Sequence, residues 1–122
     1  MRPLTARLLA TPKEVPVLRH ALREHVGAPC LDLELCVSEL LSNVIRHLGE
    51  GTPVTVRVHG TGDGRTRIEV SDPDPRSWPV PRHAADQDEG GRGLELLAAV
   101  SQRWGVVRAP GGKTVWCELA GA

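Results

Sequence analysis

The sequence predicts an α+β fold, a two-layer α/β sandwich in which helices cover one face of a mixed, mostly antiparallel sheet. Three observations carry this prediction. The chain has 122 residues, which suits one compact domain over 1–122. Its helical and alternating segments follow one another roughly as βααββαββ. Short glycine-containing turns separate neighbouring alternating segments, which favours antiparallel pairing.

The N-terminal part is predicted to hold a strand and a helix. Residues 4–10 suit a short edge strand. Thr11 followed by Pro12 is typical of a helix N-cap and first turn, so a helix is expected from there to about Val26. The apolar stripe of this helix consists of Leu18, Leu22 and Val26.

The second helix, expected from about Leu31 to Leu48, ends before the stop signals Gly49 and Gly51. At about 100° per residue, one arc is apolar and holds Val37, Leu40, Leu41, Val44, Ile45 and Leu48. The opposite arc is polar and holds Glu39, Asn43, Arg46 and His47. Residues one turn apart share a face. The Glu39 carboxylate and the Asn43 carboxamide can therefore act as a base and a metal ligand over one substrate.

Two alternating segments, 53–59 and 65–72, predict strands joined by a hairpin through Gly62-Asp63-Gly64. One face of the resulting sheet is expected to be buried and the other wet. Residues 73–91 then lack periodicity, which predicts a functional loop or lid.

The C-terminal part is predicted to contain a third helix and two further strands. The helix is expected from about Leu94 to Arg103, and the strands over 104–108 and 114–119. A turn containing Gly111-Gly112 joins the two strands.

Composition narrows the classes of function. The 15 basic and 15 acidic side chains balance, so the charge that holds nucleic acid or an anionic membrane is not expected. The cysteines Cys30, Cys36 and Cys117 lack CxxC spacing, which favours buried thiols over a disulfide framework or a zinc site. Without a leader pattern or an apolar run near the roughly 18 residues of a membrane span, the protein is expected to be soluble and cytoplasmic.

A glycine-rich stretch, Gly90-Gly91-Arg92-Gly93, precedes the third expected helix. Unpaired N–H groups and the helix dipole favour an anion there, and a flexible loop entering an ordinary helix is the alternative. The triplet Gly112-Lys113-Thr114 resembles the end of a P-loop, but Val107 stands where that motif needs glycine. The triplet is therefore interpreted as part of a hairpin.

Four motifs in order resemble those of the GHKL, or Bergerat-fold, ATPases. They are Glu39-x-x-x-Asn43 on a helix, Asp72 at a strand end, Gly91-x-Gly93-Leu94 opening a helix, and Gly-Gly-Lys-Thr before the last strand. More narrowly, Glu-Leu-x-x-Asn-x-x-x-His is similar to the anti-sigma-factor serine/threonine kinases, the histidine-kinase-like ATPase branch that regulates transcription by partner switching. The resemblance covers about residues 12–119 and implies the Bergerat fold.

The resemblance implies ATP and Mg²⁺ as cofactors and assigns roles to the motif residues. Glu39 matches the general base that acts on a substrate serine or threonine hydroxyl, and Asn43 matches the Mg²⁺ ligand. Asp72 matches the acceptor of the adenine amino group, assisted by Thr114 from the adjoining strand. Each position also has an ordinary interpretation: a solvated side chain for Glu39, a loop bridge for Asn43, and turn initiation for Asp72.

The remaining site candidates extend the phosphate side of the pocket. The nucleotide-binding loop would contain Gly91, Arg92, Gly93 and Leu94. Arg46 and His47 follow Asn43 by three and four positions and are candidates to face phosphate. A histidine near the C-terminal helix dipole is the alternative interpretation of His47.

The first glycine box departs from the family pattern. Where the family has Asp-x-Gly-x-Gly, this chain has Asp72-Pro73-Asp74-Pro75-Arg76, so both glycine positions are lost. Proline fixes φ and removes a donor. This wall of the pocket is therefore expected to be stiffer than in the family.

The resemblance implies an ATP-binding serine/threonine protein kinase of the anti-sigma-factor type, which phosphorylates a small protein antagonist. A sigma factor is a further implied partner, and a homodimer is a candidate assembly. The second interpretation is a catalytically weak or inactive nucleotide-sensing module that binds a protein partner. The lost glycines favour the module, whereas the retained Glu39 favours the kinase.

Overall fold

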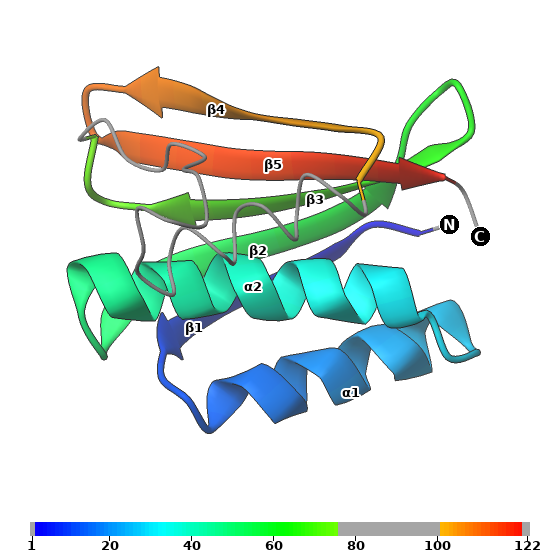
Figure 1. The fold of residues 1–122 in the computed structure, drawn as a ribbon, viewed down its shortest axis with the longest axis horizontal. Helices are drawn as coiled ribbons and strands as arrows, with labels where there is room; N and C mark the ends of the chain where they lie inside the picture. The colour runs from blue at the N-terminus through cyan, green and yellow to red at the C-terminus, as the bar shows by residue number, and fades with distance from the viewer. Residues whose placement is uncertain (1, 76–100, 121–122) are drawn as a thin grey trace, which may run out of the picture.

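A computed structural model describes residues 2–75 and 101–120. Figure 1 shows a sheet covered on one face by a pair of helices, which confirms the predicted α+β sandwich. The elements in chain order are β1 (Leu4–Ala10), α1 (Glu14–Val26), α2 (Leu31–Leu48), β2 (Thr52–Gly60), β3 (Arg65–Asp72), β4 (Arg103–Ala109) and β5 (Gly112–Ala120).

The sheet contains five strands in the order β1-β2-β3-β5-β4. Every pairing between the described strands is antiparallel. The pairing of β3 with β5 places the last strand inside the sheet rather than at its edge. In that register Asp72 lies opposite Lys113, although the two residues are 41 positions apart in the sequence.

Helix α2 lies against the sheet, and α1 lies beside it, in contact with α2 and β1 (Figure 1). The predicted apolar arc of α2 is confirmed, because Val37, Leu40, Leu41 and Val44 are at most 2% exposed. Burial of one such side chain contributes about 1.5–3 kcal/mol. This arc therefore fixes α2 on the sheet. The sheet completes the core with Val54, Val56, Val58, Ile68, Val70, Val115 and Cys117.

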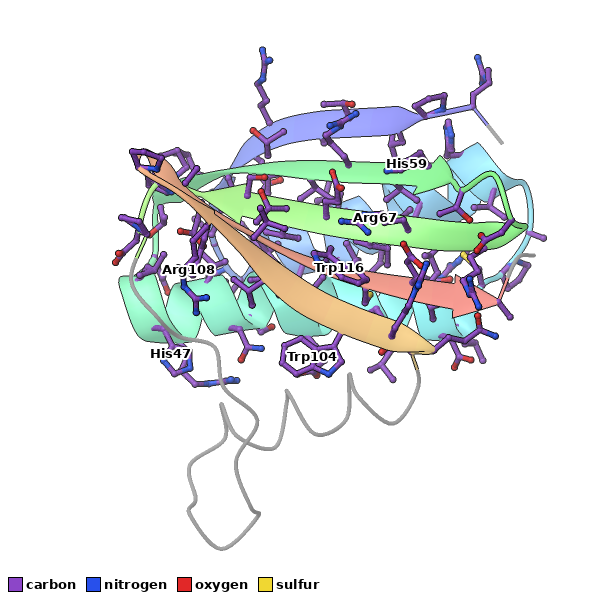
Figure 2. The ribbon with its side chains drawn as sticks, turned by 90° about the horizontal axis from the view of Figure 1, so that it is seen from above. His47, His59, Arg67, Trp104, Arg108 and Trp116 are labelled. Carbon is purple, nitrogen blue, oxygen red and sulfur yellow. The ribbon has the colours of Figure 1, made fainter. Side chains whose placement is uncertain are left out.

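The opposite face of the sheet is polar, as the strand alternation predicted. Arg67 of β3 lies over the ring of Trp116, 4.1 Å from its centroid. Its guanidinium also pairs with Glu69 and Glu118 at 2.9 Å. Figure 2 shows Arg67 and Trp116 close together on neighbouring strands. Where β3 and β5 pair, this face is thus built from ion pairs around one aromatic side chain.

Helix α1 begins later than predicted. Its N-cap is Lys13, with no side-chain cap, so the expected cap at Thr11 is wrong. The carbonyl of Thr11 accepts from the N–H of Glu14 at 3.0 Å, and that of Pro12 accepts from Val15 at 3.3 Å. The backbone of Thr11 and Pro12 therefore forms a turn ahead of the helix. The hydroxyl of Thr11 is buried without a partner among the described residues.

The third expected helix lies outside the described residues up to position 100, and its predicted end is wrong. Ser101 and Gln102 form a bend, and Arg103 is the first residue of β4. The N–H of Gln102 donates to the carbonyl of Glu118 at 2.8 Å, and Nε of Arg103 donates to the Glu118 carboxylate at 2.6 Å. The contact with β5 thus takes the backbone N–H of Gln102, which a helix would otherwise use. Of the expected lid, only 73–75 fall within the described part.

The cysteines are free, with Cys36 and Cys117 buried and Cys30 half-buried. Cys36 and Cys117 therefore match the predicted buried thiols. Burial and Glu34 raise the pKa of Cys30. Among the helices of the described residues, none has the length and apolarity needed to cross a membrane.

Candidate functional site

Three elements bring polar residues to one end of the molecule, where α2 ends, β3 ends and β5 begins (Figure 1). Helix α2 contributes Asn43, β3 contributes Asp72 and β5 contributes Lys113, and all three are buried. Asp72 has the same strand parity as Ile68 and Val70, which are core residues. Side chains of one parity share a face, so Asp72 points toward the helix layer.

Asp72 and Lys113 form a buried ion pair. Nζ of Lys113 lies 3.1 Å from Oδ1 of Asp72, and both side chains are 0% exposed. The same Oδ1 accepts from the N–H of Asp74 at 2.8 Å, and Nζ also donates to the carbonyl of Asp74 at 2.9 Å. By contrast, Oδ2 of Asp72 is buried and has no hydrogen-bond partner among the described residues. The carboxylate thus keeps one open acceptor.

Gly112 allows β5 to begin directly against the end of β3. A Cβ at this position would overlap the carbonyl oxygen of Asp72 and lie 3.2 Å from Cα of Pro73. A residue without a side chain fits this close approach of two backbones. Because Lys113 follows immediately, the approach sets its ammonium group beside the carboxylate.

Asn43 is 1% exposed and half satisfied. Its Oδ1 accepts from Nη1 of Arg46 at 3.0 Å, whereas its Nδ2 is buried without a partner among the described residues. A buried donor left unpaired costs about 1–3 kcal/mol. A ligand oxygen, such as that of a phosphate, would satisfy Nδ2. A metal ion at Oδ1 would require Arg46 to release that atom.

Glu39 lies one turn before Asn43 and is half-buried. Its carboxylate makes no hydrogen bond or ion pair with the described part of the chain. An unengaged carboxylate beside a ligand site is chemically suited to accept a proton. The polar arc of α2 thus contains a buried amide and an available carboxylate.

Basic side chains surround this end of the molecule. Arg46 and His47 are exposed at the end of α2, and Arg108 is exposed near the end of β4. Figure 2 shows His47 and Arg108 at the same end of the molecule, and Arg108 lies opposite Lys113 in the strand register. Two arginines at this end, Arg46 and Arg108, attract an anion.

The structure separates Thr114 from Asp72. Its hydroxyl lies 2.7 Å from that of Ser71. Adjacent residues on a strand point to opposite faces, so Thr114 and Ser71 lie on the face turned away from Asp72 and Lys113. Lys113 therefore stands where the motif resemblance had led us to expect Thr114. The candidates Gly91, Arg92, Gly93 and Leu94 lie outside the described residues.

The sequence interpretation missed Lys113, although a signal was present. Lys113, Val115 and Cys117 alternate along β5, and all three are buried. This period of two places a lysine on the apolar face of a strand, where it needs an anionic partner. The partner is Asp72, which the strand register supplies from a distant part of the sequence.

A hollow of about 560 Å³ lies beside the altered glycine box. Its volume falls within the range of about 300–1,000 Å³ typical of small-molecule sites. Prolines supply much of the wall. The lining residues are Leu48, Thr52, Pro53, Pro73, Asp74 and Pro75.

Comparison with known proteins finds one that is similar in sequence and others that are similar in fold. An uncharacterized protein of Streptomyces coelicolor is 49% identical over 86 residues, which cover 70% of this chain and 82% of that protein. A crystal structure of the RsbU and RsbW domains of a Mycobacterium tuberculosis protein has a TM-score of 0.70 at 22% identity over 98% of this chain. This chain spans 32% of the length of that structure.

A second structure is similar over a shorter part. The histidine kinase domain of a blue-light activated histidine kinase from Erythrobacter litoralis has a TM-score of 0.52 at 20% identity, covering 72% of this chain and 42% of that one. At such identities both structures show a shared fold.

The family assignment comes from the sequence match itself. The family model described as the histidine kinase-like ATPase domain matches residues 8–119. This match contains α2 and the strand ends that carry Asn43, Asp72 and Lys113. The chain therefore belongs to the family of histidine kinase-like ATPase domains.

Proposed function

We propose that this protein is an ATP-dependent serine/threonine kinase of the anti-sigma-factor type, which phosphorylates a small protein antagonist. One observation carries the proposal. The polar arc of α2 places the unengaged carboxylate of Glu39 one turn from the unpaired amide donor of Asn43. A base and a group that binds phosphate oxygen are thereby offered from one rigid element, as phosphoryl transfer requires.

In the proposed reaction, Glu39 takes the proton from a serine or threonine hydroxyl of the substrate protein. The hydroxyl oxygen then forms a bond to the γ-phosphorus of ATP, while the bond between that phosphorus and the β–γ bridging oxygen breaks. The products are the phosphorylated protein and ADP. Arg46 and Arg108, which are exposed at this end, would balance the charge of the phosphates.

We assign binding of the adenine base to Asp72 and binding of Mg²⁺ to Asn43, both of which are buried. Oδ2 of Asp72 is an open acceptor, which suits the adenine amino group. Asn43 is the residue proposed to hold Mg²⁺, and this requires Arg46 to leave Oδ1, which it now holds at 3.0 Å. When bound, the ion neutralises phosphate charge.

The motif resemblance supplies the partner class. We propose an anti-sigma-factor antagonist as the substrate, a sigma factor as a second partner, a homodimer as a candidate assembly, and the cytoplasm as the location. The fold likeness to a structure that contains an RsbW domain is compatible with this class.

A second candidate function is a weak or inactive nucleotide-sensing module that binds a protein partner. A specific observation favours it: Oδ1 of Asn43 is held by Arg46 and Oδ1 of Asp72 is held by Lys113. One polar atom of each side chain is therefore already engaged within the protein. The prolines that replace the glycine box point the same way.

Transfer of labelled γ-phosphate from ATP to a purified antagonist separates the two candidates. The kinase should label the antagonist, and Glu39→Gln should slow labelling by about 10²–10⁴-fold, because loss of a general base has effects of that size. Glu50→Gln is the matched control, since Glu50 is exposed just beyond the end of α2. Unchanged labelling by Glu39→Gln would remove Glu39 from the role of base.

A further inference from the structure

We infer that Lys113 is a positioning residue that determines purine specificity. It holds one oxygen of Asp72 and leaves the other to accept a hydrogen bond from the amino group of the purine. This inference rests on the proposed nucleotide site. It assigns a function to a residue that the motif resemblance leaves without one.

The contacts fix the carboxylate in one orientation. Oδ1 of Asp72 receives Nζ of Lys113 at 3.1 Å and the N–H of Asp74 at 2.8 Å. Nζ is itself anchored by the carbonyl of Asp74 at 2.9 Å. Because of these contacts, the carboxylate cannot turn without breaking charge-assisted hydrogen bonds.

The remaining oxygen is set apart from these contacts. Oδ2 is buried and unpartnered among the described residues, and the Asp72 side chain is 0% exposed. A buried, charged acceptor without a donor is costly. A base that presents an amino group removes this cost, whereas one that presents a carbonyl or a bare C–H does not.

Lys113 is more than a charge partner under this inference. A buried ion pair by itself is weak evidence for stability, and a purely structural pair would affect all nucleotides equally. A pair that orients the carboxylate instead affects only the part of the nucleotide affinity that comes from the purine amino group. The ratio of two nucleotide affinities therefore separates the two roles.

The test compares ATP with purine riboside triphosphate, which lacks the 6-amino group. Dissociation constants are measured by titration calorimetry for the wild type and for Lys113→Met. The wild type should prefer ATP by about tenfold or more, the usual effect of a hydrogen bond to a charged group. In Lys113→Met the preference should fall to about threefold or less, because Oδ1 then keeps only the N–H of Asp74 and Oδ2 is held less firmly toward the adenine amino group.

The chain offers a matched control, because Lys13 and Lys113 are its two lysines. Lys13 is exposed ahead of α1, so Lys13→Met should keep the wild-type preference. If Lys113→Met does not fold, Lys113→Gln is the second variant. Its amide nitrogen is uncharged and stands one bond closer to the backbone than Nζ, so its hold on Oδ1 is weaker and the preference should fall severalfold.

The outcomes separate this inference from the proposed function. An unchanged preference for ATP in the folded variant, Lys113→Met or failing that Lys113→Gln, would overturn the role of Lys113 and leave the kinase proposal standing. Equal weakening of both nucleotides would mean a structural role only. Absence of ATP binding by the wild type would overturn the proposed function, and this inference with it.

Discussion

Buried carboxylates at both ends of α2 are each held by a basic side chain from another element. Asp72 forms an ion pair with Lys113 near the end of the helix, and Glu34 forms one with Arg23 near its start. The Glu34 side chain is 0% exposed, and its Oε1 lies 2.7 Å from Nη2 of Arg23. Arg19 lies 3.7 Å away. The hydrogen bond from Arg23 holds the pKa of Glu34 below its ordinary value, in spite of burial.

Glu34 should make stability depend on pH. The pKa of Glu34 in the folded protein is depressed below an unfolded value near 4.3. Its contribution to the free energy of unfolding is therefore complete above about pH 5 and is lost as pH falls through the folded pKa. Urea unfolding should therefore show Glu34→Gln to be less stable than the wild type at pH 7. The difference should narrow between about pH 5 and pH 3.

Glu24→Gln is the control for this effect. Glu24 is 71% exposed and pairs with His20, 69% exposed, on the same helix, so its substitution should change stability little. A gap between wild type and Glu34→Gln that stays constant from pH 7 to pH 3 would contradict the depressed pKa of Glu34.

The position of a strand can depend on one residue at which two backbones come close, as at the start of β5. Two adjacent glycines, Gly111 at the end of the turn after β4 and Gly112 at the start of β5, have different surroundings. A Cβ on Gly111 would have nothing within 4 Å, whereas a Cβ on Gly112 would overlap the carbonyl of Asp72. The start of β5, and with it the position of Lys113, thus depends on the absence of one methyl group.

Substitution of the two glycines should give unequal results. Gly112→Ala should lower the free energy of unfolding by about 1–3 kcal/mol, the usual cost of overpacking. Gly111→Ala should change it by no more than about 0.5 kcal/mol. Urea midpoints measured at an unchanged m-value report both changes. Equal midpoints for the two variants would show that β5 does not approach β3 as closely as described.

At the scale of the whole molecule, local patterns predicted the elements, and distant pairings decided the site. The apolar arc of α2 and the alternation of β2 and β3 are short-range patterns, so their existence and extent could be read from the sequence. The ion pair of Asp72 with Lys113 joins positions 41 apart. It depends on the strand order, in which β5 lies between β3 and β4.

Errors in the sequence interpretation have the same origin. The third helix is predicted to end at about Arg103, but that residue pairs with Glu118 of β5 and belongs to β4. Thr114 was assigned to the adenine side by its motif, but the strand parity turns it to the other face. In both cases the position of β5 was the missing information.

The site as a whole exists because α2, β3 and β5 meet at one end, where an open acceptor on Asp72 and an open donor on Asn43 are buried. The central claim is that these groups bind ATP. Titration calorimetry of ATP with Mg²⁺ tests it most directly, with wild type and Asn43→Ala compared. We predict saturable binding by the wild type that depends on the metal and is lost in Asn43→Ala. Absence of binding by the wild type at millimolar ATP would contradict the claim.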